Sequence, residues 1–232
     1  TSGDANTVVG ATAGLLLTDG ADNVMIGSGA GDGSTSVANA VLIGVSAGTA
    51  GLTTAANGTV AIGRSAGAAI TASTNSRENT FIGNSAGAAM TIGDGSVAVG
   101  AFALDAEVAG NYSVAIGYEA LSAQTVGSDT DIHNVALGYR AGKMNVTGVN
   151  NTFVGSQSGQ GVATNSNTGN TAVGKDSLLA VTTGSYNVCV GRSAGSGLTD
   201  GAANVIIGVS AGDTSAEMGK MVVIGASACS ED

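Results

Sequence analysis

The chain has 232 residues, of which 39 are Gly and none is Pro or Trp, and 10% are charged, against roughly 25% in an average soluble domain. Hydrophobic residues make up 43%, too many for a disordered chain, and the net charge of −10 disfavours nucleic acids and anionic membrane surfaces as partners. No apolar run reaches about 18 residues, so we expect no membrane insertion.

One short motif, which begins with Val or Thr and ends with Gly, recurs along the whole chain. Its Gly lies at positions 10, 27, 44, 63, 83, 100, 117, 138, 155, 174, 191, 208 and 225. Of the twelve intervals, eight are 17 residues long, two are 19, one is 20 and one is 21. A constant minimum with small additions is typical of a solenoid whose coils carry an extensible loop. We therefore interpret residues 1–232 as one repeat array.

The three residues before each motif Gly predict a short strand, from 7–9 in the first copy to 222–224 in the last. The residue three before the Gly is always Val or Thr, such as Val114, and the residue one before it is Val, Ile or Leu, such as Ile116. The residue between them varies. This alternation has the period of a strand, and we expect the fixed face to be buried in every coil. Ile116→Asp should then disrupt its coil.

The motif Gly, for example Gly27, Gly44, Gly117 and Gly191, is expected to permit a backbone conformation or a close approach that a Cβ would block. The residue three after it is always Ala or Ser, which implies a second tight contact. Asn stands four before the Gly in eight of the thirteen copies. It could bond to local backbone or form a ladder through successive coils.

These patterns predict an all-β fold, a parallel β-solenoid or β-roll of about thirteen coils of 17–21 residues. Such a coil is thin, and the variable middle position still carries large apolar residues, among them Met25, Phe81 and Ile206. Packing several chains around an axis would bury both apolar faces. We therefore expect a homotrimer, intertwined or packed, with little stable monomer.

The additions before Gly63, Gly83, Gly138 and Gly174 are expected to bulge outward. The longest creates the loop 121–133, which contains the chain's single His, His133, together with Asp129 and Asp131. A solvated loop is the simplest interpretation. Receptor recognition and a metal site are alternatives, although Asp-x-Asp-x-His lacks the full ligand set of a calcium loop.

Tyr118 and Tyr139 both follow a motif Gly directly, in consecutive coils, with Arg140 and Lys143 nearby. They should stack on one face, as a pair that stabilises the sheet or as a small binding patch for a glycan or a partner protein. We find no convergent catalytic set in the sequence, so we expect no enzyme and no cofactor.

The segments SVAVG (96–100) and SVAIG (113–117) resemble the head repeats of YadA-type trimeric autotransporter adhesins. The longer segments NTFIGNSAG (79–87), NTFVGSQSG (151–159) and TTGSYNVCVGRSAG (182–195) resemble repeats of phage tail fibres even more closely. The resemblance covers essentially the whole chain and implies a trimeric left-handed parallel β-roll in a fibre. Coils of 17 residues are longer than the adhesin repeats, which favours the phage branch.

The resulting expectation is a structural or adhesive segment of a phage tail fibre, located in the virion and involved in host attachment. Its partners would be further copies of itself, other fibre or virion proteins, and a glycan or protein of the host cell surface. The alternative is the head of a bacterial surface adhesin. An ice-binding solenoid is remote, because Thr occupies the first strand position in only four copies. We also expect a further domain, such as a chaperone, to follow residue 232 in the gene product; a gene product that ends at residue 232 is the alternative.

Overall fold

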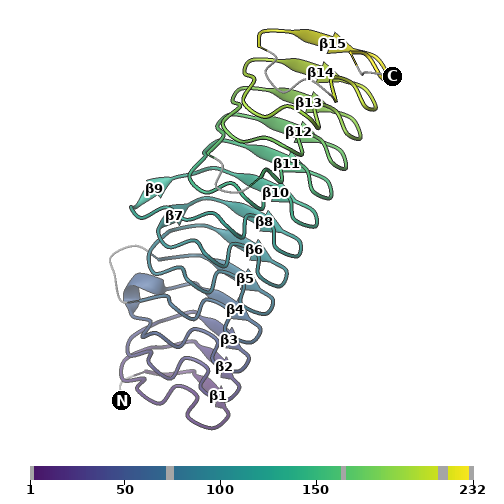
Figure 1. Cartoon of the computed structure of the whole chain (residues 1–232). Coiled ribbons are helices and arrows are strands. Elements are labelled where there is room, and N and C mark those ends of the chain that lie inside the picture. Colours follow the sequence, from purple (N-terminus) through teal and green to yellow (C-terminus); the bar gives the residue numbers. More distant parts are fainter. Residues whose placement is uncertain (1–2, 72–75, 163–165, 214–218, 230–232) are drawn as a thin grey trace. The chain divides into compact units, whose positions relative to one another are not determined.

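The computed structural model describes residues 3–71, 76–162, 166–213 and 219–229. The chain divides into two compact units, the first formed by Thr1–Ser113 with Thr125–Asp131 and the second by Val114–Gln124 with Ile132–Asp232. Each unit is a parallel β-solenoid, in which short strands stack coil upon coil (Figure 1). The described residues hold no helix with the length and apolar character to cross a bilayer.

In the first unit, each motif copy forms a strand of three residues that pairs in parallel with the strand of the next coil. One 3₁₀ helix, η1 (Thr54–Ala56), and the short pair β7 (Gly110–Asn111) and β9 (Thr130–Asp131) stand outside this stack. The stacked strands are β1 (Thr7–Val9), β2 (Val24–Ile26), β3 (Val41–Ile43), β4 (Val60–Ile62), β5 (Thr80–Ile82) and β6 (Val97–Val99).

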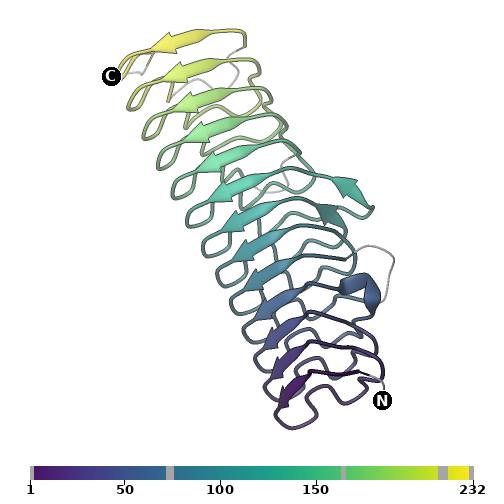
Figure 2. The ribbon, with the colours of Figure 1, turned by 180° about the vertical axis from the view of Figure 1, so that it is seen from behind.

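The second unit repeats the arrangement, and Figure 2 shows the stacked strands of each unit from behind. Neighbouring strands are again parallel and in register, so that Val114 pairs with Val135 and Ile116 with Leu137. The strands are β8 (Val114–Ile116), β10 (Val135–Leu137), β11 (Thr152–Val154), β12 (Thr171–Val173), β13 (Val188–Val190), β14 (Val205–Ile207) and β15 (Val222–Ile224).

The predicted strands are confirmed, but the face expected to be buried was wrong. The variable middle residue points into the solenoid: Met25, Phe81 and Phe153 are fully buried. The fixed residues on either side point outward, and Ile116 is 36% exposed within the single chain. The described coils therefore carry an outer stripe of Val, Ile, Leu and Thr side chains. Val114 and Ile116 belong to this outer stripe, not to the core of the coil.

In several coils two core positions compensate in size, the middle strand residue and the residue four after the motif Gly. Beside Phe81 the latter is Gly87, where an added Cβ would lie 2.6 Å from Phe81 Cδ1. In the coil of Ala98 it is instead Leu104, which is fully buried. The same exchange recurs in Ala115 with Leu121 and in Ala172 with Leu178. In these coils a small middle residue is accompanied by a large residue after the turn, so the middle position can vary although it lies in the core.

The motif Gly is required for two reasons at once. Its φ lies near +135°, for example +133° at Gly27 and +135° at Gly117 and Gly191, a region that side chains rarely adopt. The coils also touch there: a Cβ on Gly44 would lie 2.5 Å from the carbonyl oxygen of Gly63. The strand therefore ends at a point where the backbones of successive coils approach closely.

Buried Asn side chains connect successive coils just before the strands. Asn170 Nδ2 donates to the carbonyl oxygen of Gly184 at 2.8 Å, and Asn170 Oδ1 accepts from the backbone N–H of Asn187 at 2.9 Å and from its Nδ2 at 3.1 Å. Both interpretations of this position, local bonding and a ladder, therefore hold together. Each Asn satisfies backbone groups that the turn would otherwise leave buried and unpaired.

Two of the predicted outward additions lie in described residues. Before Gly63 the addition forms η1, and before Gly138 residues 127–131 carry largely exposed side chains around β9. The extra residues before Gly83 and Gly174 fall on 72–75 and 163–165, outside the described residues.

Candidate functional site

The second unit brings Tyr118 and Tyr139 together as the sequence predicts. Each directly follows a motif Gly, so the parallel register of β8 and β10 places the two side chains one above the other. Their ring centroids are 5.8 Å apart with an interplanar angle of 13°. Both side chains remain 43% exposed. The stack therefore contributes apolar packing between coils and still presents ring edges and hydroxyl groups at the surface.

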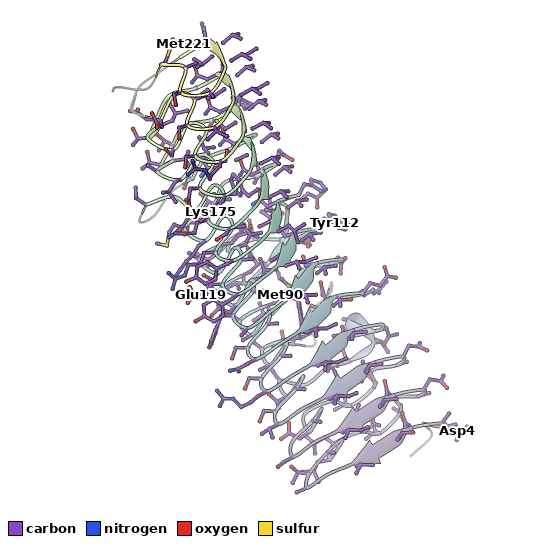
Figure 3. The ribbon with its side chains drawn as sticks, turned by 90° about the vertical axis from the view of Figure 1, so that its right-hand side faces the viewer. Asp4, Met90, Tyr112, Glu119, Lys175 and Met221 are labelled. Atoms are coloured by element: carbon purple, nitrogen blue, oxygen red, sulfur yellow. The ribbon has the colours of Figure 1, made fainter. Side chains whose placement is uncertain are left out.

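A carboxylate that the sequence analysis did not single out organises the cations beside this stack. Glu119 Oε2 accepts from Lys143 Nζ at 2.6 Å and from Arg140 Nε at 2.7 Å. The hydrogen bond from Lys143 lowers the pKa of Glu119, an effect that partial burial opposes and Arg140 reinforces. The hydrogen bond to Glu119 likewise raises the pKa of Arg140. Figure 3 shows Glu119 on the outside of its coil.

Arg140 also lies over the Tyr139 ring, with Cζ 4.9 Å from the ring centroid. Tyr139 is thus contacted by Tyr118 and by a guanidinium, a favourable cation–π arrangement. One carboxylate balances one of the two cations, so the patch of Tyr118, Tyr139, Arg140, Lys143 and Glu119 carries a net charge of about +1 on a strongly acidic chain. Stacked rings with an ordered ion pair favour a stabilising role over an open platform for a sugar ring.

The loop residues considered for a metal do not form a ligand cluster. In the first unit, Asn111 Nδ2 donates to Asp129 Oδ1 at 2.7 Å and to Asp131 Oδ1 at 3.1 Å, so these carboxylates serve the pairing of β7 with β9. His133 belongs to the second unit and is exposed with φ +52°. Among the described residues, no group of three or more His, Cys, Asp or Glu side chains could hold a metal ion.

A fully buried carboxylate, Glu107, holds the projecting segment of the first unit. Its Oε1 accepts from the backbone N–H groups of Val108, Ala109 and Gly110 at 2.9, 3.0 and 2.9 Å, and from Val126 at 3.1 Å. The four converging amides satisfy this buried carboxyl oxygen with hydrogen bonds. Glu107 therefore fastens the start of the segment 125–131 to the coil below it.

The thiol of Cys189 lies inside the solenoid at the middle strand position. Burial raises its pKa to about 12, so the thiol stays protonated at neutral pH and is a poor nucleophile. Cys189 acts here as a small core residue.

Sequence reasoning missed a polar hollow in the first unit, of about 450 Å³, lined by Asn39, Thr54, Asn57, Gly58, Arg77 and Glu78. Three of these residues, Asn39, Gly58 and Glu78, stand five before a motif Gly and have positive φ. The corresponding residue has positive φ in the other coils too, including Tyr112 and Tyr186. The sequence did carry one signal for this backbone conformation. Asn and Gly recur five residues before the motif Gly, and both tolerate the left-handed region.

Comparison of the chain with protein-family models, with curated proteins and with solved structures found no match.

Proposed function

We propose that this protein is a structural and adhesive segment of a homotrimeric fibre, most simply a bacteriophage tail fibre that takes part in host attachment. The observation that carries the proposal is the outer stripe, the fixed Val, Ile, Leu and Thr side chains that flank the middle residue of each strand. A stripe of this kind recurs in every described coil, so it extends along each unit.

The stripe fits a second and third copy of the same chain better than an unrelated partner. It repeats with the coil period, and identical chains in parallel would present identical stripes at identical spacing. Closed rotational symmetry then allows every chain to bury its stripe around one axis. Burial of apolar surface contributes about 25 cal/mol per Å². A long narrow interface between chains would therefore add stability that one chain alone, with its stripe exposed, lacks.

The proposed role is mechanical as well as adhesive. In a solenoid, neighbouring coils are the only close contacts, and stability grows with each added coil. Such an array suits a shaft that holds binding elements away from a particle. The Tyr118–Tyr139 patch and the segment around β9 lie on the outside of their coils, where a protein of the cell surface could reach them. The motif resemblance supports the phage setting over a bacterial adhesin head.

Sedimentation equilibrium at micromolar concentration tests the assembly. We expect a trimer for the wild-type chain and dissociation for Ile116→Asp, because this substitution places a charge in the proposed interface. Val162→Asp is the matched control, since Val162 is also exposed but lies outside the strands. A folded, soluble wild-type monomer, or equal effects of the two substitutions, would contradict the trimer.

Immunogold labelling of virions and of bacterial cells with antibodies against the chain tests the setting. Labelling along tail fibres is the expected result. Labelling confined to the bacterial surface would favour the adhesin instead.

A further inference from the structure

A second surface feature runs along the first unit, at the corner that precedes the strands. Asn39, Gly58, Glu78, Gly95 and Tyr112 each stand five residues before a motif Gly, and we call them the Asn39–Tyr112 row. All five have positive φ, between +57° and +75°. Each donates its backbone N–H to a carbonyl of the preceding coil at 2.9 to 3.2 Å. The row is therefore a rigid ladder whose rungs are roughly 4.8 Å apart.

The backbone of the row is fully engaged, but its side chains point away from the coil. Asn39, Glu78 and Tyr112 are exposed, and Tyr112 projects outward in Figure 3. Positive φ is unusual for a residue as bulky as Tyr. Along the row, polar side chains therefore alternate with glycine positions and lead to an aromatic ring.

The hollow lies over Gly58, between Asn39 and Glu78. A Cβ added at Gly58 would make only an ordinary van der Waals contact, with Glu78 Cγ at 3.6 Å, so a side chain can be placed here without a clash. Thr54 from η1 forms part of the wall, and Arg77 adds a guanidinium. Neither Arg77 nor Glu78 forms an ion pair with any other residue that the structure describes. The hollow thus offers uncommitted donors and acceptors of several kinds.

The aromatic end of the row is formed by Tyr112 and Gly95. The Cδ1–Cε1 edge of the ring lies over Gly95, where a Cβ would come within 2.9 and 3.1 Å of these atoms. The absence of a side chain at Gly95 therefore makes room for the ring, which is 45% exposed. Such a ring can pack against the C–H groups of a sugar while its hydroxyl bonds to water or ligand.

The charges around the hollow favour an uncharged ligand. Arg77 is flanked in sequence by Glu78, and its backbone N–H donates to Asp94 Oδ1 at 2.8 Å. The chain as a whole carries −10. A polyanion would be repelled, whereas vicinal hydroxyl groups can bond to a guanidinium, a carboxylate and amides at once.

We propose that the Asn39–Tyr112 row binds a linear neutral oligosaccharide. One sugar ring packs on Tyr112, and another is hydrogen-bonded in the hollow over Gly58, three coil steps or roughly 14 Å away. The row lies at the corner before the strands and not on the outer stripe. This binding site therefore does not depend on the trimer proposed above.

Isothermal titration of the wild-type chain with cellohexaose, maltohexaose, chitohexaose and mannohexaose tests the proposal, with a hyaluronan hexasaccharide as the charged comparison. We expect at least one neutral hexasaccharide to bind. Tyr112→Ala should weaken that binding about tenfold or more by removing the stacking surface. Gly58→Asn should weaken it to a similar extent, because Asn tolerates positive φ and its side chain would fill the hollow.

Tyr186→Ala is the matched control. Tyr186 lies over Gly169 with the same ring edge, but it belongs to the second unit, whereas the hollow lies in the first. The Tyr186→Ala variant should bind the hexasaccharide with the affinity of the wild type. All three variants should show the thermal unfolding of the wild type. The proposal is overturned if no neutral hexasaccharide binds, if hyaluronan alone binds, if Tyr112→Ala and Gly58→Asn retain affinity, or if Tyr186→Ala abolishes it.

Discussion

The two units share one coil design but differ in the ladder that joins their coils. In the second unit, Asn134, Asn151, Asn170, Asn187 and Asn204 follow one another without interruption, each bonded to the next. In the first unit, Asn6 bonds to Asn23, but the following coils have Ala40, Thr59, Asn79, Ser96 and Ser113 at this position. The same fold therefore forms with a complete ladder and with a broken one.

The difference shows what the ladder adds. Ser113 reaches its neighbour through a backbone N–H to Ser96 Oγ at 3.3 Å, whereas Asn204 donates to Asn187 Oδ1 through its backbone N–H at 3.0 Å and its Nδ2 at 2.9 Å. The Asn ladder also survives a longer coil, since Asn170 bonds across 19 residues to Asn151. The fold thus does not require an uninterrupted Asn ladder, and the ladder adds hydrogen bonds between the coils where it is present.

The largest loss of folding stability is expected at the motif Gly, a position at which the two units do not differ. Gly44→Ala in the first unit and Gly117→Ala in the second should each cost more than about 4 kcal/mol, because the new Cβ would lie within 2.5 Å of a backbone carbonyl at forbidden φ. Denaturant unfolding measures the loss. Gly127→Ala is the control, because no heavy atom lies within 4 Å of its added Cβ. A mild effect at either motif Gly would mean that the coils can separate locally.

Removing one Asn from each ladder addresses the difference between the units directly. Asn170→Ala removes four side-chain bonds and should cost about 3–5 kcal/mol. The side chain of Asn79 makes two hydrogen bonds: it donates to the carbonyl of Gly93 and accepts from the N–H of Ser96. Asn79→Ala should therefore cost about 2 kcal/mol. Amide hydrogen exchange should detect faster opening around the altered coil.

Asn84→Ala is the control for both substitutions, since Asn84 lies outside the ladder and the one described bond of its side chain is accepted from the hydroxyl of its neighbour Ser85. Equal losses for Asn170→Ala and Asn79→Ala would contradict the expectation that the number of side-chain bonds sets the cost.

Much of this design could be predicted from the sequence, because it depends on local rules. Strand positions, coil lengths and the need for Gly27 or Gly117 follow from a strict period and from sterics. The Tyr118–Tyr139 stack follows from the register alone. These features require only that each coil repeats the one before it.

Which face of each strand is buried could not be predicted by the same reasoning. Constancy of type was taken to mark the core, yet the constant residues face outward and the varied ones, such as Phe81 and Ala98, face inward. In some coils a residue six positions later compensates for the core position, as Gly87 does for Phe81 and Leu104 does for Ala98. The hollow over Gly58 was equally hidden, because its lining comes from three different coils.

The smallest effect on stability is expected from the ion pairs, which are a further difference between the two units. The three ion pairs among described residues, Glu119 with Arg140, Glu119 with Lys143 and Lys175 with Asp176, all lie in the second unit. The pKa of Glu119 is lowered below its ordinary value of 4.5, chiefly by the hydrogen bond from Lys143. A lowered pKa means that the folded state holds the charged form more strongly than the unfolded state does.

The stabilisation from Glu119 should therefore be complete above pH 4.5 and should disappear as the pH falls through the lower pKa of the folded state. Because the group is near the surface and screened by salt, the change should be well below that of the Asn substitutions. Thermal unfolding of wild type and Glu119→Gln between neutral pH and pH 3 measures it, and the gap between their curves should close on acidification. Glu78→Gln, at a residue without an ion pair to any other described residue, should leave no such closing gap. A gap between wild type and Glu119→Gln that persists at pH 3 would show that Glu119 stabilises the coil through its packing and not through its charge.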